Sequence, residues 1–312
     1  MYRNSLVDGS KASVMAVYDC FTFFNEYDLL QVRLMEHSPF VDQFVIAQGS
    51  HTFSGKPNPH RLDLTEQRFA PFASKITLIN VSLKPAPCNA WENEYRQRDA
   101  LLEAVAWSDD DVLLLSDLDE IVSRNSWPAV LRRLRTDPVL SIRMGVFYYF
   151  INLRADREIS VAKMATGRAC RSAGVTSQEL RVSDAPDTED ICGWHFSYLG
   201  DEEFIRNKIQ SFSHQEFNRR EITDSGQIQR ALRRQRDLFG RRIGYGWVPF
   251  DESWPLAMVQ DAAWQRYVCP KRSRLLQMYD DVCAGTSRLC AKGMSRSRRL
   301  IGAVMGRRSH QC

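Results

Sequence analysis

The sequence lacks any apolar run long enough to cross a membrane. No stretch of its 312 residues approaches the ~20 apolar residues of a spanning helix. The N-terminal residues MYRNSLVDGSKAS have no apolar core of the signal-peptide type either. We therefore expect a chain that stays in the compartment where it is made, the cytoplasm, with at most peripheral membrane contact.

Two kinds of short motif are also missing. The eight cysteines include no CxxC pair and no zinc-type spacing, which predicts mostly reduced thiols rather than a disulfide framework. Cys20 and Cys192 lie inside apolar runs and are expected in the core. No glycine-rich phosphate loop is present, because SGKP at 54–57 has the wrong spacing. This absence argues against a nucleotidyltransferase that takes a nucleoside triphosphate.

Acidic residues are absent from the C-terminal end. Residues 285–312 contain seven Lys and Arg and no Asp or Glu, so residues 1–284 carry a net charge of −3, the difference between +4 and +7. Such a tail could lie on an anionic membrane surface, or it could be a solvated terminus. The acidic body, without an alternating basic and aromatic pattern, argues against a nucleic-acid partner.

Apolar runs alternate with segments of helical periodicity. Strands are predicted at 14–23, 44–48, 75–83 and 112–116, and helices after Asn25 and over 89–107. Continuous apolar strands separated by helices favour an α/β fold with a mainly parallel central sheet flanked by helices. The predicted divisions are an N-terminal extension (1–13), one α/β domain (14–284) and the basic tail (285–312).

The run VLLLSDLDE at 112–120 ends in three acidic residues. If Val112–Leu115 form a parallel strand, Asp117, Asp119 and Glu120 emerge at its C-terminal end, where open α/β sheets bind ligands. Crowded carboxylates favour a bound cation, and Mg²⁺ or Mn²⁺ prefers such oxygen ligands while leaving positions for substrate phosphates. Alternatively, Asp119 caps a helix beginning near Arg124 and Asp117 forms an ordinary turn.

Several segments together resemble one family. They are DCFTFFNEYDLLQVRL (19–34), FVIAQGSHTFSGKPNPH (44–60), NAWENEYRQRDAL (89–101), SDLDEIVSR (116–124), GWHFSYLG (193–200) and KIQSFSHQEFN (208–218). Taken in order, they resemble the bisecting N-acetylglucosaminyltransferases of glycosyltransferase family 17, in a form without an anchor. Two positions depart from the family pattern: Gln48 stands where Glu is frequent, and Val122 replaces a Pro after the acidic motif.

The resemblance implies a GT-A-like domain over residues 14–284, a divalent metal and a UDP-sugar donor, by analogy UDP-N-acetylglucosamine. It also implies an inverting transfer to the hydroxyl of a glycan, glycolipid or polysaccharide acceptor. The acidic motif maps to Asp117 and Asp119, with Glu120 adjoining. A catalytically silent protein that binds nucleotide sugars or glycans is the alternative on the same fold.

Each remaining candidate has a structural alternative. His195 is expected to complete the metal site, or to be a structural residue. Trp194 stacks on a sugar or fills the core. Arg98 holds the donor phosphates, or forms a salt bridge with Glu94. Asn25 and Glu26 meet the nucleoside, or cap the next helix.

Inverting transfer needs a general base, usually a carboxylate. Asp119 and Glu120 are the predicted catalytic residues because they adjoin the expected metal. Later candidates, among which the sequence does not choose, are Asp201, Glu202, Asp251 and Glu252. His214 is expected near the acceptor, although a histidine at a helix end needs no function.

Overall fold

The computed structural model describes residues 15–172 and 174–271, and its main compact unit ends at Cys269. The predicted N-terminal extension and basic tail lie outside these residues. No helix within the described ranges is long and apolar enough to span a membrane. Cys20 and Cys192 are buried, as expected, and the cysteines of the described ranges are free thiols.

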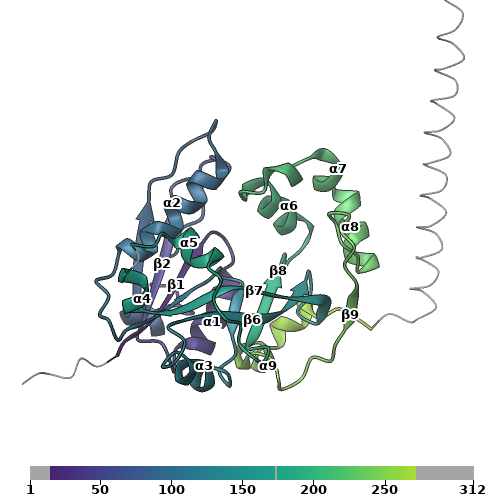
Figure 1. Ribbon diagram of the computed structural model, residues 1–312. Coiled ribbons are helices and arrows are strands. Elements are labelled where there is room, and N and C mark those ends of the chain that lie inside the picture. The colour runs from purple at the N-terminus through teal and green to yellow at the C-terminus, as the bar shows by residue number, and fades with distance from the viewer. Residues whose placement is uncertain (1–14, 173, 272–312) are drawn as a thin grey trace, which may run out of the picture. The chain divides into compact units, whose positions relative to one another are not determined.

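A nine-stranded sheet organises the unit, with the order β3-β2-β1-β4-β7-β6-β8-β5 and β9 paired to β7 (Figure 1). The strands are β1 (Val17–Phe23), β2 (Gln43–Gly49), β3 (Ile76–Val81), β4 (Val112–Leu115), β5 (Glu120–Val122), β6 (Val139–Tyr148), β7 (Leu153–Thr166), β8 (Gly193–Ser197) and β9 (Tyr245–Trp247). The α/β class is confirmed. The first four strands are parallel as predicted, but β7 runs antiparallel to β4 and β6, and β5 antiparallel to β8.

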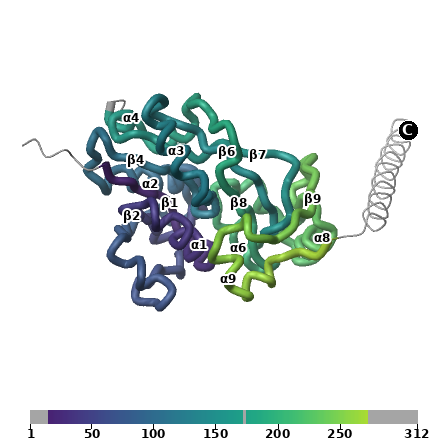
Figure 2. The backbone as a smooth tube through the Cα atoms, turned by 90° about the horizontal axis from the view of Figure 1, so that it is seen from below, coloured from purple at the N-terminus to yellow at the C-terminus, as the bar shows by residue number. Residues whose placement is uncertain are grey.

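Helices cover both faces of the sheet. They are α1 (Tyr27–His37), α2 (Ala90–Glu103), α3 (Trp127–Arg133), α4 (Gly167–Ser172), α5 (Ser177–Val182), α6 (Glu202–Ser211), α7 (Arg220–Thr223), α8 (Ser225–Arg234) and α9 (Leu256–Gln260). Short 3-10 helices are η1 (Ala70–Lys75), η2 (Gln215–Phe217) and η3 (Ala262–Tyr267). Viewed from below, α1 and α9 lie side by side under the sheet (Figure 2).

The parallel strands are apolar throughout because alternate side chains enter two different cores. Phe21 and Leu114 pack with Leu30 of α1, whereas Cys20 and Leu113 belong to the core that contains α2. Side chains of a strand alternate between the faces of a sheet, so a strand covered on both faces needs apolar residues at every position. This packing fixes β1 and β4 side by side, with their C-terminal ends at the same edge.

Local signals begin the two helices that flank this edge. Asn89 precedes α2 and its side chain accepts the Trp91 N–H, while Asp201 precedes α6 and accepts the Phe204 N–H. Such side-chain acceptors satisfy donors that the first turn of a helix leaves unpaired. Figure 1 shows α2 and α6 on opposite sides of the sheet region that contains β1, and β4 pairs with β1 in parallel.

Candidate active site

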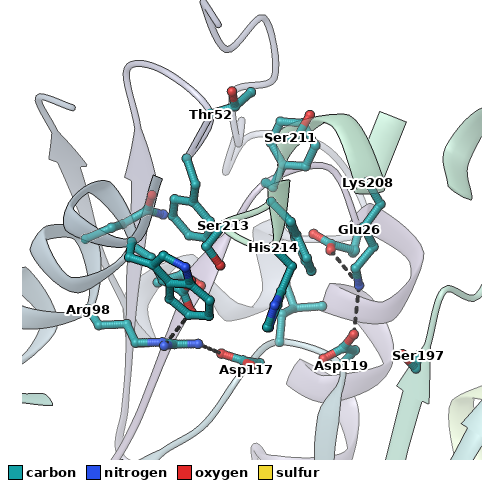
Figure 3. A pocket seen from close by; sticks show the side chains of 18 of the residues that line it. Glu26, Thr52, Arg98, Asp117, Asp119, Ser197, Lys208, Ser211, Ser213 and His214 are labelled. Atoms are coloured by element: carbon teal, nitrogen blue, oxygen red, sulfur yellow. Dashed lines mark hydrogen bonds and ion pairs between the residues drawn. The ribbon is translucent and has the colours of Figure 1, made fainter. Parts of the chain in front are cut away.

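A pocket of about 590 Å³ opens at the C-terminal ends of β1 and β4 (Figure 3). Its walls come from the loop after β1, the loop at 51–58, α2, the acidic loop after β4, β8, α6 and the segment at 212–217. The sequence-predicted residues that line it are Glu26, Arg98, Asp117, Asp119, His195 and His214. This volume lies in the range of small-molecule sites, about 300–1,000 Å³.

Asp117 is held between two arginines. Arg98 Nη2 donates to Asp117 Oδ1 at 2.7 Å, and Arg181 Nη2 donates to Oδ2 at 3.1 Å. Arg98 also pairs with Glu94 Oε1 at 2.5 Å, so the predicted salt bridge exists as one part of a chain of ion pairs. Although burial opposes it, the attraction of Arg181 and Arg98 holds the pKa of Asp117 well below its usual range.

Asp119 faces a buried lysine. Lys208 Nζ, on α6, donates to Asp119 Oδ2 at 2.8 Å and lies 3.3 Å from Glu26 Oε1 (Figure 3). Burial alone would lower the pKa of Lys208, but Asp119 and Glu26 outweigh it and raise the pKa. Lys208 is therefore a permanent cation that joins the acidic loop to the loop after β1.

His195 approaches the same aspartate from β8. Its Nε2 lies 3.6 Å from Asp119 Oδ1, and its Nδ1 is buried without a partner. The strand is positioned by Gly193, whose Cβ, if it had one, would lie 2.1 Å from the carbonyl oxygen of Ile121. Only glycine permits β5 and β8 to pair this closely, and the pairing places His195 opposite Glu120.

The backbone of the acidic loop is held from below by Arg33 of α1, which is 0% exposed. Its Nη1 donates to the carbonyl oxygens of Asp117 and Glu120 at 2.7 and 2.8 Å. Its Nη2 donates to Ser116 Oγ at 2.6 Å and to Asp19 Oδ1 at 2.5 Å. One guanidinium thus supplies several hydrogen bonds to the backbone of the acidic loop from its buried side.

Asp19, on β1, completes this support. Burial would raise its pKa, but Arg33 and His37 lower it to about 2, so the carboxylate stays charged. His37 Nδ1 lies 2.7 Å from Asp19 Oδ2, and His37 Nε2 accepts the Val122 N–H at 3.0 Å. The neutral ring therefore carries its proton on Nδ1 and links β1 to β5.

Three predicted site residues lie elsewhere. Glu120 is 1% exposed and does not line the pocket; its Oε2 accepts the Asp117 N–H at 2.9 Å and faces Arg181. Trp194 packs in the core, stacked with Trp254, because neighbouring side chains of β8 point to opposite faces and His195 takes the pocket side. Asn25 lines a second cavity instead.

One of the two simpler alternatives for the acidic motif is confirmed, because Asp117 begins a turn in which its carbonyl oxygen accepts the Glu120 N–H at 3.0 Å. The other is wrong. Asp119 caps no helix, since β5 follows it directly and α3 begins after Ser126. Glu26 precedes α1, but its side chain makes no capping hydrogen bond. Gln48 is 4% exposed and bonds Asn80 and the Leu62 N–H, which is a structural position away from the pocket.

Sequence reasoning gave no role to Arg33, Lys208 or Arg181, although each bonds the acidic loop. Arg33 and Lys208 lie in two of the segments that resemble the family, 19–34 and 208–218, and this position is the only feature of the sequence that marks them. Arg181 lies in α5, outside those blocks, and reaches Asp117 only through tertiary packing.

Among the described residues, no three His, Cys, Asp or Glu side chains converge as a complete metal site. A pair does converge: two ligands about 2.1 Å from one ion lie about 3–3.5 Å apart, close to the separation of Asp119 Oδ1 and His195 Nε2. Asp117 is directed to its arginines instead. The site therefore fits a cation that takes its other ligands from water or a bound substrate.

Comparison with known proteins gives one family. The model of Glycosyltransferase family 17 matches residues 8–242. No curated protein matches the sequence.

Three solved structures are among those similar to the chain. S. aureus TarS 1–349 is 12% identical, with a TM-score of 0.39, and 68% of this chain and 70% of that chain are covered. The mannosyltransferase PcManGT from Pyrobaculum calidifontis was solved with GDP-Man and Mn²⁺. It is 11% identical, with a TM-score of 0.35, and 64% of this chain and 62% of that chain are covered. Glucosyl-3-phosphoglycerate synthase from Mycobacterium tuberculosis was solved with Mn²⁺, UDP-glucose and phosphoglyceric acid. It is 12% identical, with a TM-score of 0.31, and 83% of this chain and 97% of that chain are covered.

Proposed function

Because the chain belongs to glycosyltransferase family 17, we propose that it is a metal-dependent, inverting enzyme of the nucleotide-sugar type. The donor is a UDP-sugar, by analogy with the family UDP-N-acetylglucosamine, and the acceptor is a hydroxyl group of a glycan. One observation carries the proposal. The acidic loop, at the C-terminal end of a parallel strand, enters a pocket in which two arginines and one lysine face it.

The arginines suit the diphosphate of the donor. Arg98 and Arg181 present planar guanidinium groups on one side of the pocket, and Asp117 holds both in place. Guanidinium groups bind phosphate oxygens through paired, charge-assisted hydrogen bonds. We assign Asp117 the task of orienting them, alongside the metal-ligand role that the family motif suggests.

The charge balance of the site supports a divalent cation. Within residues 15–172 and 174–271, five linked carboxylates face three cations, which leaves two negative charges on these eight groups. The carboxylates are Glu26, Glu94, Asp117, Asp119 and Glu120, and the cations are Arg98, Arg181 and Lys208. A nucleoside diphosphate would be repelled by this excess. Asp119 and His195 would hold Mn²⁺ or Mg²⁺, which supplies positive charge to the departing diphosphate.

The remaining groups of the chain orient the reaction. Arg98 and Arg181 bind the phosphates, while Lys208 fixes the carboxylate of Asp119. Aromatic side chains of the opposite wall, including Tyr198, Phe217 and Phe239, offer ring faces of the kind that sugars contact. These residues restrict water and hold a sugar in one orientation, which favours transfer over hydrolysis.

Calorimetric titration of UDP into the purified protein, with Mn²⁺, with Mg²⁺ and with chelator, tests the proposal. We expect binding that requires the metal and is lost in Asp119→Asn. Asp137→Asn is the matched control, because Asp137 lies outside the pocket and its side chain contacts Arg133 and Thr136 at the surface. Absence of UDP binding under every condition would refute the nucleotide-sugar assignment. Tight binding without turnover of any UDP-sugar would favour the silent binding protein.

A further inference from the structure

A second cavity, of about 340 Å³, adjoins the donor pocket at Glu26, which lines both. It lies among the start of α1, the segment at 199–204 and η3. We propose that this cavity receives the acceptor as a neutral sugar, and that Glu26 is the general base of the transfer. The inference rests on the proposed function and assigns the acceptor side of the same reaction.

The charges of the two cavities distinguish donor from acceptor. Arg98, Arg181 and Lys208 line the first pocket, and together with the proposed metal they would offset its carboxylates and bind an anionic diphosphate. In the described residues, the second cavity is lined by three carboxylates, those of Glu26, Asp28 and Asp201, and by one guanidinium, that of Arg68. A phosphate would meet repulsion there, whereas the hydroxyl groups of a neutral sugar can donate to carboxylates.

Aromatic rings supply the other half of sugar recognition. Tyr27 and Tyr267 line the second cavity and are only partly buried, so ring surface remains exposed. Arg68 stacks on Tyr27, with its guanidinium carbon 5.2 Å from the ring centroid, and Tyr267 Oη donates to Asp28 at 3.1 Å. The rings are thus fixed before a ligand arrives, which lowers the entropic cost of binding.

Glu26 is the carboxylate at the junction, and the other acids of the donor pocket have different partners. Glu94 and Asp117 pair with arginines. Asp119 contacts His195 and lies 2.8 Å from Lys208 Nζ, which is closer to Asp119 than to Glu26. Glu216 is exposed and pairs with His214. These contacts leave Glu26 as the described residue best placed to meet both substrates.

The contacts of Glu26 orient it without neutralising it completely. Its Oε2 accepts the Asn25 N–H at 3.2 Å, and its Oε1 lies 3.3 Å from Lys208 Nζ, which is closer to Asp119 at 2.8 Å. One ammonium contacts both carboxylates, so Glu26 lies near the Asp119 site. An inverting displacement needs the base and the leaving group on opposite faces of the anomeric carbon, which we assign to the second cavity and the donor pocket.

The proposed step balances as follows. The acceptor hydroxyl oxygen forms a bond to the anomeric carbon of the donor, and its O–H bond breaks as the proton passes to a carboxylate oxygen of Glu26. The bond between the anomeric carbon and the phosphate oxygen breaks, and its electron pair leaves with the nucleoside diphosphate. Configuration at the anomeric carbon is inverted.

The test measures UDP release from UDP-N-acetylglucosamine with Mn²⁺, without acceptor and with three neutral probes, mannotriose, chitotriose and maltotriose. Glu26→Gln should retain metal-dependent UDP binding and lose turnover by about 100-fold or more, as expected for removal of a general base. Glu26→Asp should keep part of the rate. Asp201→Asn tests the other candidate base of the same cavity, which caps α6, and Asp137→Asn, outside both cavities, is the matched control.

A second variant tests the cavity. One or more of the three trisaccharides should accelerate UDP release from the donor. Tyr267→Ala should raise the KM for that trisaccharide, while UDP affinity and the rate of UDP release without acceptor stay the same. Full turnover of Glu26→Gln, or loss of turnover in Asp201→Asn instead, would overturn the assignment of the base. If no trisaccharide accelerates UDP release, or if Tyr267→Ala leaves the KM for the trisaccharide unchanged, the acceptor site is overturned. Failure of the wild type to bind UDP would instead count against the proposed function.

Discussion

Replacing Asp19 by Asn should reveal how far the buried cluster beneath the acidic loop supports both the fold and the site. Asp19 and Arg33 are each 0% exposed, so the variant leaves a buried guanidinium without its counter-charge. The pKa of Asp19 falls from 3.8 to about 2, and at about 1.4 kcal/mol per pKa unit this corresponds to roughly 2–3 kcal/mol of stability at neutral pH. Breaking a buried ion pair costs about 3–5 kcal/mol. We therefore expect a loss of about 3 kcal/mol.

The loss of stability in Asp19→Asn should be smaller at low pH than at neutral pH. A carboxyl group whose pKa is lowered by folding stabilises the protein above its unfolded pKa, and this stabilisation disappears as the pH falls from 3.8 through about 2. At pH 3 the contribution of Asp19 should be about half of its value at pH 7. The difference between wild type and Asp19→Asn should therefore narrow on acidification.

Urea unfolding at pH 7 and pH 3 measures both effects, and calorimetric titration of UDP at pH 7 measures the consequence for the site. UDP binding should weaken in Asp19→Asn because Arg33, which Asp19 orients, bonds the backbone of the acidic loop. Asp137→Asn, on the surface, should change neither quantity appreciably. A loss below about 1 kcal/mol at pH 7, or an equal difference at both pH values, would refute this reasoning.

Three further outcomes follow from the site. Arg181→Ala should weaken UDP binding about 10- to 100-fold, since a charge-assisted hydrogen bond contributes about 1.5–3 kcal/mol, and equal affinity with the surface control Arg133→Ala would exclude a phosphate contact. His195→Ala should raise the metal concentration for half-maximal UDP binding, and an unchanged titration would make His195 structural. Gly193→Ala should lower the free energy of unfolding by about 1–3 kcal/mol, because the added Cβ would meet the Ile121 carbonyl oxygen. An unchanged unfolding curve would argue against the close pairing of β5 and β8.

The first half of the fold could be predicted because its signals are local. Runs such as Val112–Leu115 are apolar at every position, which indicates a strand covered on both faces, and the acids that follow must then leave the core together. The antiparallel half was not predictable in the same way. Pairing of β6 with β7 and of β8 with β5 depends on long-range register, which no local period encodes.

The roles of neighbouring residues were harder to separate. Alternation along a strand implies that Trp194 and His195 face opposite sides, but the sequence does not say which side is the pocket. The same limit applies to Glu120, which turns inward to bond the Asp117 N–H, while Glu26, about ninety residues earlier, reaches the junction of both cavities.

The sequence by itself determined the α/β class, the edge of the sheet at which the pocket opens, and the family, because strand hydrophobicity and ordered motifs are properties of short segments. Only the tertiary structure decided which charges meet there. Lys208 and Arg181 pair with the carboxylates of the acidic loop, and Arg33 bonds its backbone, across separations of more than sixty residues. Such ion pairs form because packing removes these groups from water, and the cost of that removal selects the partner that each charge finds.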